Sequence, residues 1–149
     1  DAGEDAIMPY TRWAALRASL WQFPVVCFTL ALLTDLAYWR SSNLMWQNFS
    51  AWLLFAGLVM GALAVLVGLI DLLLRKERAH AGRSWLCLGG QGAVLVLALV
   101  NSLVHAGDGW TAVVPNGLLL SFLTVAIIAF MAAYGRIQRP AGSGGLNYG

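Results

Sequence analysis

Charged residues are scarce in this chain, and that scarcity is the most informative property of its composition. Lys, Arg, Asp and Glu make up 11% of the 149 residues, whereas soluble domains carry about 25%. Hydrophobic residues make up 60% of the chain. Such a sequence cannot cover a water-facing surface with polar groups, so we expect a single domain that has the lipid bilayer as its solvent. The formal net charge of +2 is too small to indicate a nucleic acid as a partner.

Cysteine is also rare, and the common catalytic motifs are absent. Cys27 and Cys87 lie within apolar stretches and form no C-x-x-C pair, so we interpret both as small buried hydrophobes. The sequence contains no G-x-S-x-G, no P-loop and no glycine-rich dinucleotide turn that follows a strand. We therefore expect a protein that is not an enzyme, with no catalytic residue and no metal site.

The two ends of the chain differ from its middle. The first residues, DAGEDAIMPY, lack the basic region and small-residue cleavage site of a signal peptide. The last residues, RPAGSGGLNYG, are typical of a flexible tail. We therefore divide the chain into an N-terminal segment (1–19), a transmembrane domain (20–134) and a tail (135–149). In the first segment, PYTRWAALRASLW could lie on the inner membrane surface as an amphipathic helix or could continue the first spanning helix.

Four stretches are long and apolar enough to cross a bilayer, which takes about 20 residues per helix. They are residues 20–39, 49–74, 85–106 and approximately 113–134. Open sheets leave backbone groups without partners in lipid, and the alternating pattern of barrel strands is absent. The sequence therefore predicts an all-α fold, an integral membrane four-helix bundle.

Basic residues predict the orientation of this bundle. With four spans, the segment before the first helix, the loop between the second and third, and the segment after the fourth share one side of the membrane. Those segments carry every Lys and Arg except Arg40. Since basic loops stay in the cytoplasm, we predict that both termini are cytoplasmic.

The second expected span carries a line of small residues that ends on a carboxylate. The line steps by four and three residues, so it forms one stripe of a helix; its members are Gly57, Gly61, Ala64, Gly68 and Asp71. The G-x-x-x-G spacing lets another helix approach closely, so we expect the stripe to face a helix. We interpret Asp71 as a packing device neutralised by Arg75, four residues on, or by interfacial water; a proton or ion site is the open alternative.

The third expected span repeats small and polar residues every seven positions, at Gln91, Ala98 and His105. We expect this face to pack against the glycine stripe of the second span. Gln91 falls in the same half of the membrane as Asp71, so a hydrogen bond between these two side chains is expected, and we assign Gln91 to helix packing as well.

A second group of polar residues belongs to the outer half of the membrane. Thr34 and Asp35 come near the end of the first span, while Asn101 and His105 lie one turn apart near the end of the third. Asn116 and Ser121 lie near the start of the fourth span. Asp35 could orient and charge His105. The group is then either a proton relay, a metal or haem ligand, or an interfacial histidine hydrogen-bonded to a carboxylate. His80 and His105 cannot hold one haem in one subunit, because the third span separates them by about 30 Å.

The first two spans resemble a bacterial membrane family catalogued as domain of unknown function 2231, over about residues 21–101. That family shows His-Phe-Pro at the start of its first helix, an acid at the end of that helix, and a tryptophan-containing second helix that ends in Gly-x-x-Asp. The matching residues are Phe23, Pro24, Asp35, Ala51, Trp52, Gly57, Gly68 and Asp71. Two features depart from the family: Gln22 replaces its histidine, and the Gly-Trp-x-Gly type segment of its last helix is missing.

The resemblance implies a multi-pass protein of the bacterial inner membrane. Some family members look genetically associated with periplasmic quinoprotein sugar dehydrogenases, which implies an anchor or an electron-passing subunit. We expect a non-catalytic assembly, anchor or accessory subunit, whose partners are lipid and either other membrane subunits or further copies of itself. Two alternatives stay open: an electron-transfer subunit with haem or quinone at His105, and a small proton or ion transporter.

The substitution Asp71→Asn separates the transporter from the packing interpretation. If Asp71 carries a proton or an ion, Asp71→Asn abolishes flux into vesicles and leaves assembly intact. If Asp71 fixes helix packing, as we predict, the variant assembles poorly in detergent and the parent protein shows no flux. Flux assays and size-exclusion chromatography on both proteins distinguish these outcomes.

Overall fold

Four long helices make up nearly all of the chain that the structure describes, as the sequence predicts. The computed structural model describes the backbone of residues 4–74, 81–107 and 113–137, and the side chains of 15–73, 85–107 and 113–136. In these ranges the elements are α1 (Glu4–Ser41), α2 (Leu44–Leu74), α3 (Ala81–Ala106), the short segment η1 (Val113–Gly117) and α4 (Leu118–Ile137). Each predicted span falls on one helix that is long and apolar enough to cross a membrane. The all-α four-helix prediction is confirmed, while the orientation of the bundle stays a prediction.

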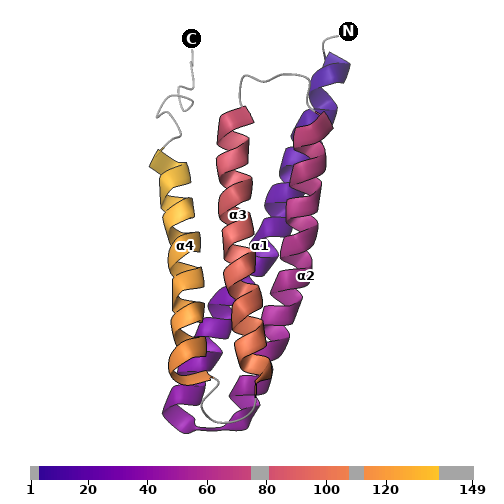
Figure 1. Cartoon of the computed structure of the whole chain (residues 1–149). Coiled ribbons are helices and arrows are strands. Elements are labelled where there is room, and N and C mark those ends of the chain that lie inside the picture. The colour runs from indigo at the N-terminus through magenta and orange to yellow at the C-terminus, as the bar shows by residue number, and fades with distance from the viewer. Residues whose placement is uncertain (1–3, 75–80, 108–112, 138–149) are drawn as a thin grey trace, which may run out of the picture.

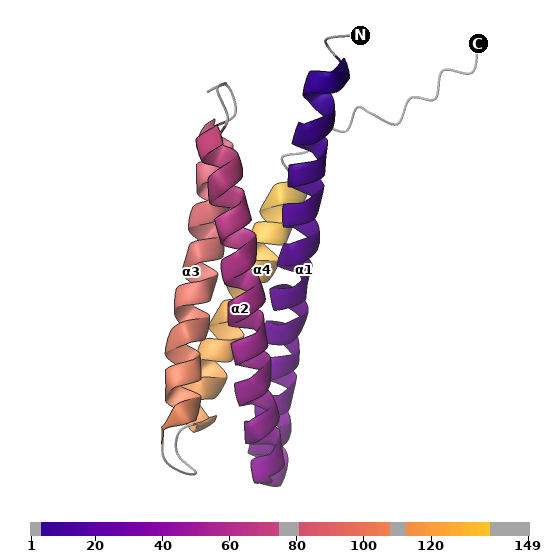
Figure 2. The ribbon, with the colours of Figure 1, turned by 90° about the vertical axis from the view of Figure 1, so that its right-hand side faces the viewer.

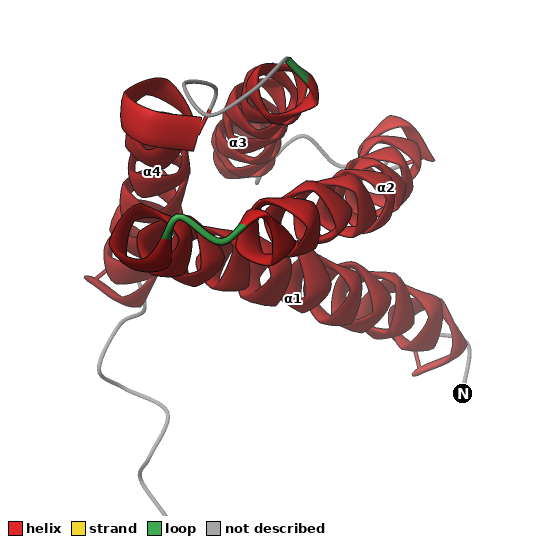
Figure 3. Ribbon diagram, turned by 90° about the horizontal axis from the view of Figure 1, so that it is seen from below, coloured by secondary structure: helices red, strands yellow, loops and turns green. Residues whose placement is uncertain are grey.

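Consecutive helices run in opposite directions and pack in a ring, α1 on α2, α2 on α3, α3 on α4 and α4 back on α1 (Figures 1 and 3). One end of the bundle, which we call the terminal end, holds the start of α1 and the end of α4. The opposite end, where α1 turns into α2, is the hairpin end. Figure 2 shows that α1 extends beyond the other helices at the terminal end. This is the antiparallel ring that short connections between helices favour.

The connection at the hairpin end consists of Ser42 and Asn43. The Ser42 N–H donates to the Tyr38 carbonyl at 2.7 Å and closes α1, and Ser42 takes the left-handed conformation with φ 51°. Asn43 caps α2, because its Oδ1 accepts the Met45 N–H at 3.0 Å. This cap explains why α2 begins at Leu44, more than a turn before the start that hydropathy alone predicts.

The other helix boundaries follow equally local causes. α1 is continuous from Glu4. The PYTRWAALRASLW segment therefore continues the first spanning helix and does not form a separate amphipathic helix. Before α4, the backbone kinks at Val114, which has extended dihedral angles of φ −121° and ψ 123°. Val114 precedes Pro115, and the proline ring disfavours helical angles in the residue before it. Regular helix therefore starts only at Leu118.

Small and polar side chains face the centre of the bundle, and most large apolar side chains face outward. The buried apolar cluster at the centre takes residues from every helix, namely Phe28, Ala31, Leu54, Val94, Ala98 and Ile128. By contrast, Trp52 and Leu86 are 71% and 72% exposed. This distribution suits a bilayer, because lipid tails are as apolar as leucine and give no reason to bury large side chains.

The glycine stripe of α2 is buried and receives large side chains from its neighbours. A Cβ atom at Gly57 would lie 2.5 Å from Phe28 Cε1 of α1, and one at Gly61 would lie 2.5 Å from Leu95 Cδ2 of α3. Gly68 similarly faces Leu88 of α3. We expected a small polar face of α3 opposite these glycines, and this expectation is wrong for Gly61 and Gly68. Leucines of α3 fill the space that the missing side chains leave, and at Gly68 they do so together with Arg17 of α1.

The substitution Gly57→Ala tests this packing. The added methyl group meets the ring of Phe28 and also the Cβ atom of Cys27, at 3.1 Å, and neither can withdraw easily. Overpacking costs about 1–3 kcal/mol. Alanine stabilises a helix by about 0.5–1 kcal/mol relative to glycine, so we expect a net loss of about 1–2 kcal/mol in the free energy of unfolding.

The control is Gly89→Ala on α3, because nothing lies within 4 Å of a Cβ atom there. Unfolding in bicelles should show Gly89→Ala at or above parent stability. Equal stability of the two variants would contradict the packing described for α2.

Candidate functional site

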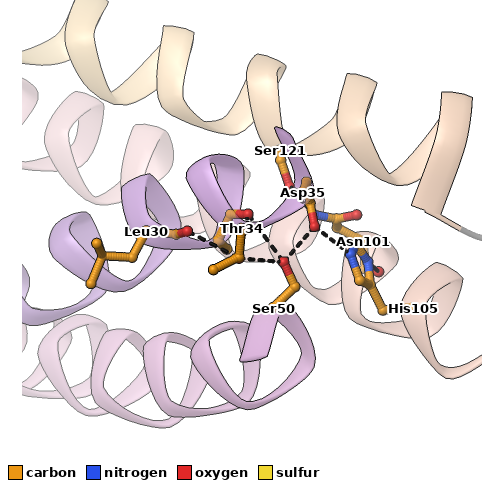
Figure 4. Close-up of polar contacts among 8 residues, drawn as sticks. Leu30, Thr34, Asp35, Ser50, Asn101, His105 and Ser121 are labelled. Atoms are coloured by element: carbon orange, nitrogen blue, oxygen red, sulfur yellow. Dashed lines mark hydrogen bonds and ion pairs between the residues drawn. The ribbon is translucent and has the colours of Figure 1, made fainter. Parts of the chain in front are cut away.

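A carboxylate near the hairpin end joins all four helices. Asp35 of α1 accepts a hydrogen bond at Oδ1 from Ser50 of α2, and the same oxygen is hydrogen-bonded to His105 Nε2 of α3 at 2.9 Å. Its Oδ2 accepts from Ser121 of α4 at 2.5 Å. We call these residues, together with Thr34 and Asn101, the Asp35 cluster (Figure 4).

The sequence places these side chains on the inner stripe of each helix. On α3, Asn101 and His105 continue the stripe that begins at Gln91 and passes through Ala98, in steps of three and four residues. On α2, Ser50 lies seven residues before Gly57 and so belongs to the glycine stripe. The antiparallel ring brings these stripes together at one depth, which no single helix could do.

Both ring nitrogens of His105 have hydrogen-bond partners inside the cluster. Nδ1 lies 2.9 Å from the backbone carbonyl of Asn101, and since a carbonyl can only accept, Nδ1 must carry a hydrogen. One further proton then lies between Nε2 and Asp35 Oδ1. The pair is either imidazolium with carboxylate or imidazole with carboxylic acid, and both forms are neutral as a whole.

The neutral pair explains how ionisable groups can be buried here. Asp35 is fully buried and His105 is 4% exposed. An isolated charge at this depth would be very costly, whereas a pair with satisfied hydrogen bonds is tolerated. Ser121 extends the network, because it also accepts from Asn101 Nδ2 at 2.7 Å. Asn101 Oδ1 is left without a partner.

The structure brings together the three residues that we expected in an outer polar site, Asp35, Asn101 and His105. It also brings Ser121 of α4 to this site and adds Ser50 of α2, which the sequence analysis did not assign to it. Ser121 is buried on α4, one turn before Thr124. The signal that could have found Ser50 is its place on the glycine stripe, where a polar residue must face the bundle.

The residues assigned to helix packing lie on buried stripes. Gly57, Gly61, Gly68 and Asp71 are buried on α2, and Gln91 is buried on α3. The hydrogen bond that we expected between Gln91 and Asp71 does not form, and Gln91 Oε1 is buried without a partner. The neighbour of Gln91 on α3, Gly90, instead faces Met131 of α4.

Ligands for a metal do not gather in the parts of the chain that the structure describes. No group of three His, Cys, Asp or Glu side chains is placed to hold an ion there. Cys27 is buried and Cys87 half-buried, and neither forms a disulfide. Arg75, which we considered as a partner of Asp71, and His80 fall outside the described residues.

Comparison with protein families gives one match, to a family described as "Predicted membrane protein (DUF2231)", over residues 16–137. The match covers all four helices, so the resemblance extends well beyond residues 21–101, where the sequence motifs placed it. No curated protein and no solved structure matches the chain. With its four apolar helices, the chain is a multi-pass membrane protein.

Removing one hydroxyl group tests whether the Asp35 cluster holds the bundle together. Ser121→Ala leaves the Asn101 amide and Asp35 Oδ2 each without a partner, so we expect it to lower the free energy of unfolding by about 1–2 kcal/mol. The matched control is Thr124→Val, one turn along α4, whose hydroxyl donates only to the Leu120 carbonyl of its own helix. That change should cost less than about 0.5 kcal/mol. If both variants lose the same free energy of unfolding in bicelles, the cluster does not hold the bundle together in this way.

Proposed function

Because this chain belongs to the DUF2231 family of predicted membrane proteins, we propose that it is a non-catalytic subunit that anchors or assembles a larger membrane complex or its own oligomer. This proposal rests on the hydrogen bonds that His105 and Asp35 make within the cluster. His105 uses both ring nitrogens and Asp35 both oxygens within the cluster. These two side chains therefore have no ring nitrogen or carboxylate oxygen without a partner that could take part in substrate chemistry.

The same hydrogen bonds of His105 weigh against the electron-transfer alternative. An axial haem ligand must present a ring nitrogen to the iron, and each nitrogen of His105 already faces an oxygen within the cluster. Ligation would break either the bond to Asp35 or the bond to Asn101 and would leave a buried polar atom behind. A quinone at His105 would meet the same competition.

An open small-residue face on α3 supports the assembly role. Gly89 and Ala93 are exposed and lie four residues apart. A Cβ atom at Gly89 or Gly92 would meet nothing within 4 Å. Small residues at this spacing allow helices to pack closely in lipid. We also propose that the terminal end faces the cytoplasm of a bacterial inner membrane, since Arg17 and Arg136 lie toward that end.

Purification of the tagged full chain from its native membranes in mild detergent tests the proposed function. We expect a colourless species larger than the monomer, or a defined set of co-purifying membrane proteins. In Ala93→Phe, which fills the small-residue face of α3, the recovered partner should fall several-fold. The control, Leu103→Phe, changes an exposed residue of the same helix and should behave like the parent.

Two results would contradict the proposal. One is that the parent protein purifies as a monomer without any partner protein, and that chemical cross-linking gives the same pattern for the Ala93→Phe and Leu103→Phe variants. The other is a visible absorption band that disappears in His105→Ala, which would favour the haem alternative.

A further inference from the structure

Gln91 of α3 carries a buried polar atom that has no hydrogen-bond partner. Its side chain is 4% exposed, and its Oε1 atom is fully enclosed. Its neighbours on the inner stripe of α3, Leu88 and Val94, are apolar and buried. Because an unpaired amide oxygen is costly in such surroundings, Gln91 Oε1 needs a hydrogen-bond donor from outside α3.

The helices α1, α2 and α3 meet at two depths, one on each side of Gln91. In each place a glycine of α2 lies between a side chain of α1 and a leucine of α3; the two sets are Pro24, Gly61 and Leu95, and Arg17, Gly68 and Leu88. Between these depths, α1 buries Leu20 and Trp21 partly, α2 buries Ala64, and α3 buries Gln91. We call these four residues the Gln91 layer.

The backbone of α1 adds a second acceptor to the Gln91 layer. In a helix, the carbonyl of one residue accepts the N–H of the residue four positions later. Pro24 has no N–H, so the Leu20 carbonyl loses its helical donor. Pro24 is fully buried, and a Cβ atom at Gly61 would lie 3.5 Å from Pro24 Cβ, so this side of α1 faces the interior. The Leu20 carbonyl adjoins the proline ring and therefore faces the interior as well.

The two oxygens, Gln91 Oε1 and the Leu20 carbonyl, are both acceptors and cannot pair with each other. No hydrogen bond joins Gln91 directly to α1 in the described part of the chain. A molecule that carries two hydrogens on one small atom serves both oxygens at once. Water has this form, and a buried water molecule takes two to four polar partners. Ordered water also pairs with the carbonyls that proline frees in membrane helices.

A metal cation suits this layer less well than water. Two neutral oxygens would leave its charge uncompensated among apolar side chains, and a buried charge without a counter-ion is very costly. On the inner stripe of α2, the carboxylate closest to the layer is Asp71, which lies toward the terminal end from Ala64, by about 10 Å along the helix. The four residues of the Gln91 layer themselves carry no anionic group.

We propose that the Gln91 layer is a binding site for one internal water molecule, which donates to Gln91 Oε1 and to the Leu20 carbonyl. The water connects α3 to α1, two helices that lie on opposite sides of the ring (Figure 3). The Asp35–His105 hydrogen bond joins the same two helices directly near the hairpin end. The bundle therefore has a direct polar contact between α1 and α3 at one depth and a water-mediated contact at another. This site goes beyond an anchoring or assembly role.

Water-edited solid-state NMR of the full chain in lipid bilayers tests the site directly, because magnetisation then passes from water to nearby carbon atoms. We expect the Gln91 Cδ signal to grow several-fold faster than the Ala98 Cβ signal, although both residues are buried on the same stripe of α3. Ala98 belongs to the apolar cluster at the centre of the bundle and serves as the internal reference. Equal growth of the two signals in the parent overturns the proposal.

Two variants test whether the Leu20 carbonyl takes part. Pro24→Ala supplies the missing N–H to that carbonyl, so the water loses one partner and the Gln91 signal should grow as slowly as the Ala98 signal. Leu20→Ala is the control, because it changes a side chain of the layer and keeps both oxygens, and it should behave like the parent. A Gln91 signal that grows as fast in Pro24→Ala as in the parent contradicts the shared site.

The same spectra distinguish water from a cation. If the site holds water, the Gln91 Cδ chemical shift should stay the same when N-methylglucamine replaces sodium in the buffer. A chemical shift that moves with the sodium concentration would show a cation at Gln91 and would overturn the proposal.

Thermal unfolding in bicelles gives an independent test of the shared water. In the parent, the N–H that Pro24→Ala introduces displaces the water from the Leu20 carbonyl and leaves Gln91 Oε1 unpaired. In a Gln91→Leu background this cost is absent, so Pro24→Ala should raise Tm by about 2–4 °C more there than in the parent. Equal changes in Tm in the two backgrounds would show that the two oxygens do not share a ligand.

Discussion

The carboxylate of Asp35 is hydrogen-bonded to side chains from the three other helices, and the arrangement of the bundle depends on it. In water, burial of apolar side chains would hold four helices together. In lipid that force is absent between helices, so close packing and polar contacts decide which faces meet. A buried carboxylate without partners would be very costly. The fold therefore has to bring Ser50, His105 and Ser121 to one depth, and this requirement fixes how the inner stripes align.

The two halves of the bundle meet this requirement in different ways. At the hairpin end, polar side chains from all four helices form hydrogen bonds around Asp35. Through the middle and toward the terminal end, α2 offers glycines, and Phe28, Leu95 and Leu88 fill the space above them. One half is specified by hydrogen bonds and the other by shape. Both leave the outer surface to large apolar residues, where it can meet lipid or other membrane subunits.

Hydropathy and charge were sufficient to predict four helices, because only helices and closed barrels can span a bilayer. The proximity of Asp35, Asn101 and His105 could be predicted as well, because polar side chains at one depth in the membrane pair with one another. Ser50 was missed because a serine in a span is not unusual until the stripe it shares with Gly57 is considered. The leucines opposite Gly61 and Gly68 could not be predicted, because the rotation of α3 about its axis depends on all its neighbours together. The cap at Asn43 was overlooked because hydropathy ignores polar residues before a span.

The most direct test of the central claim is a double-mutant cycle between Asp35 and His105, with unfolding free energies of the parent, Asp35→Asn, His105→Gln and the double variant measured in the same bicelles. Neutral substitutions of similar shape remove the shared proton and leave the other contacts nearly in place. If the pair ties α1 to α3, the two substitutions are coupled by about 1–2 kcal/mol. Additive effects, with a coupling within about 0.3 kcal/mol of zero, would show that the two side chains do not depend on each other and would contradict the account.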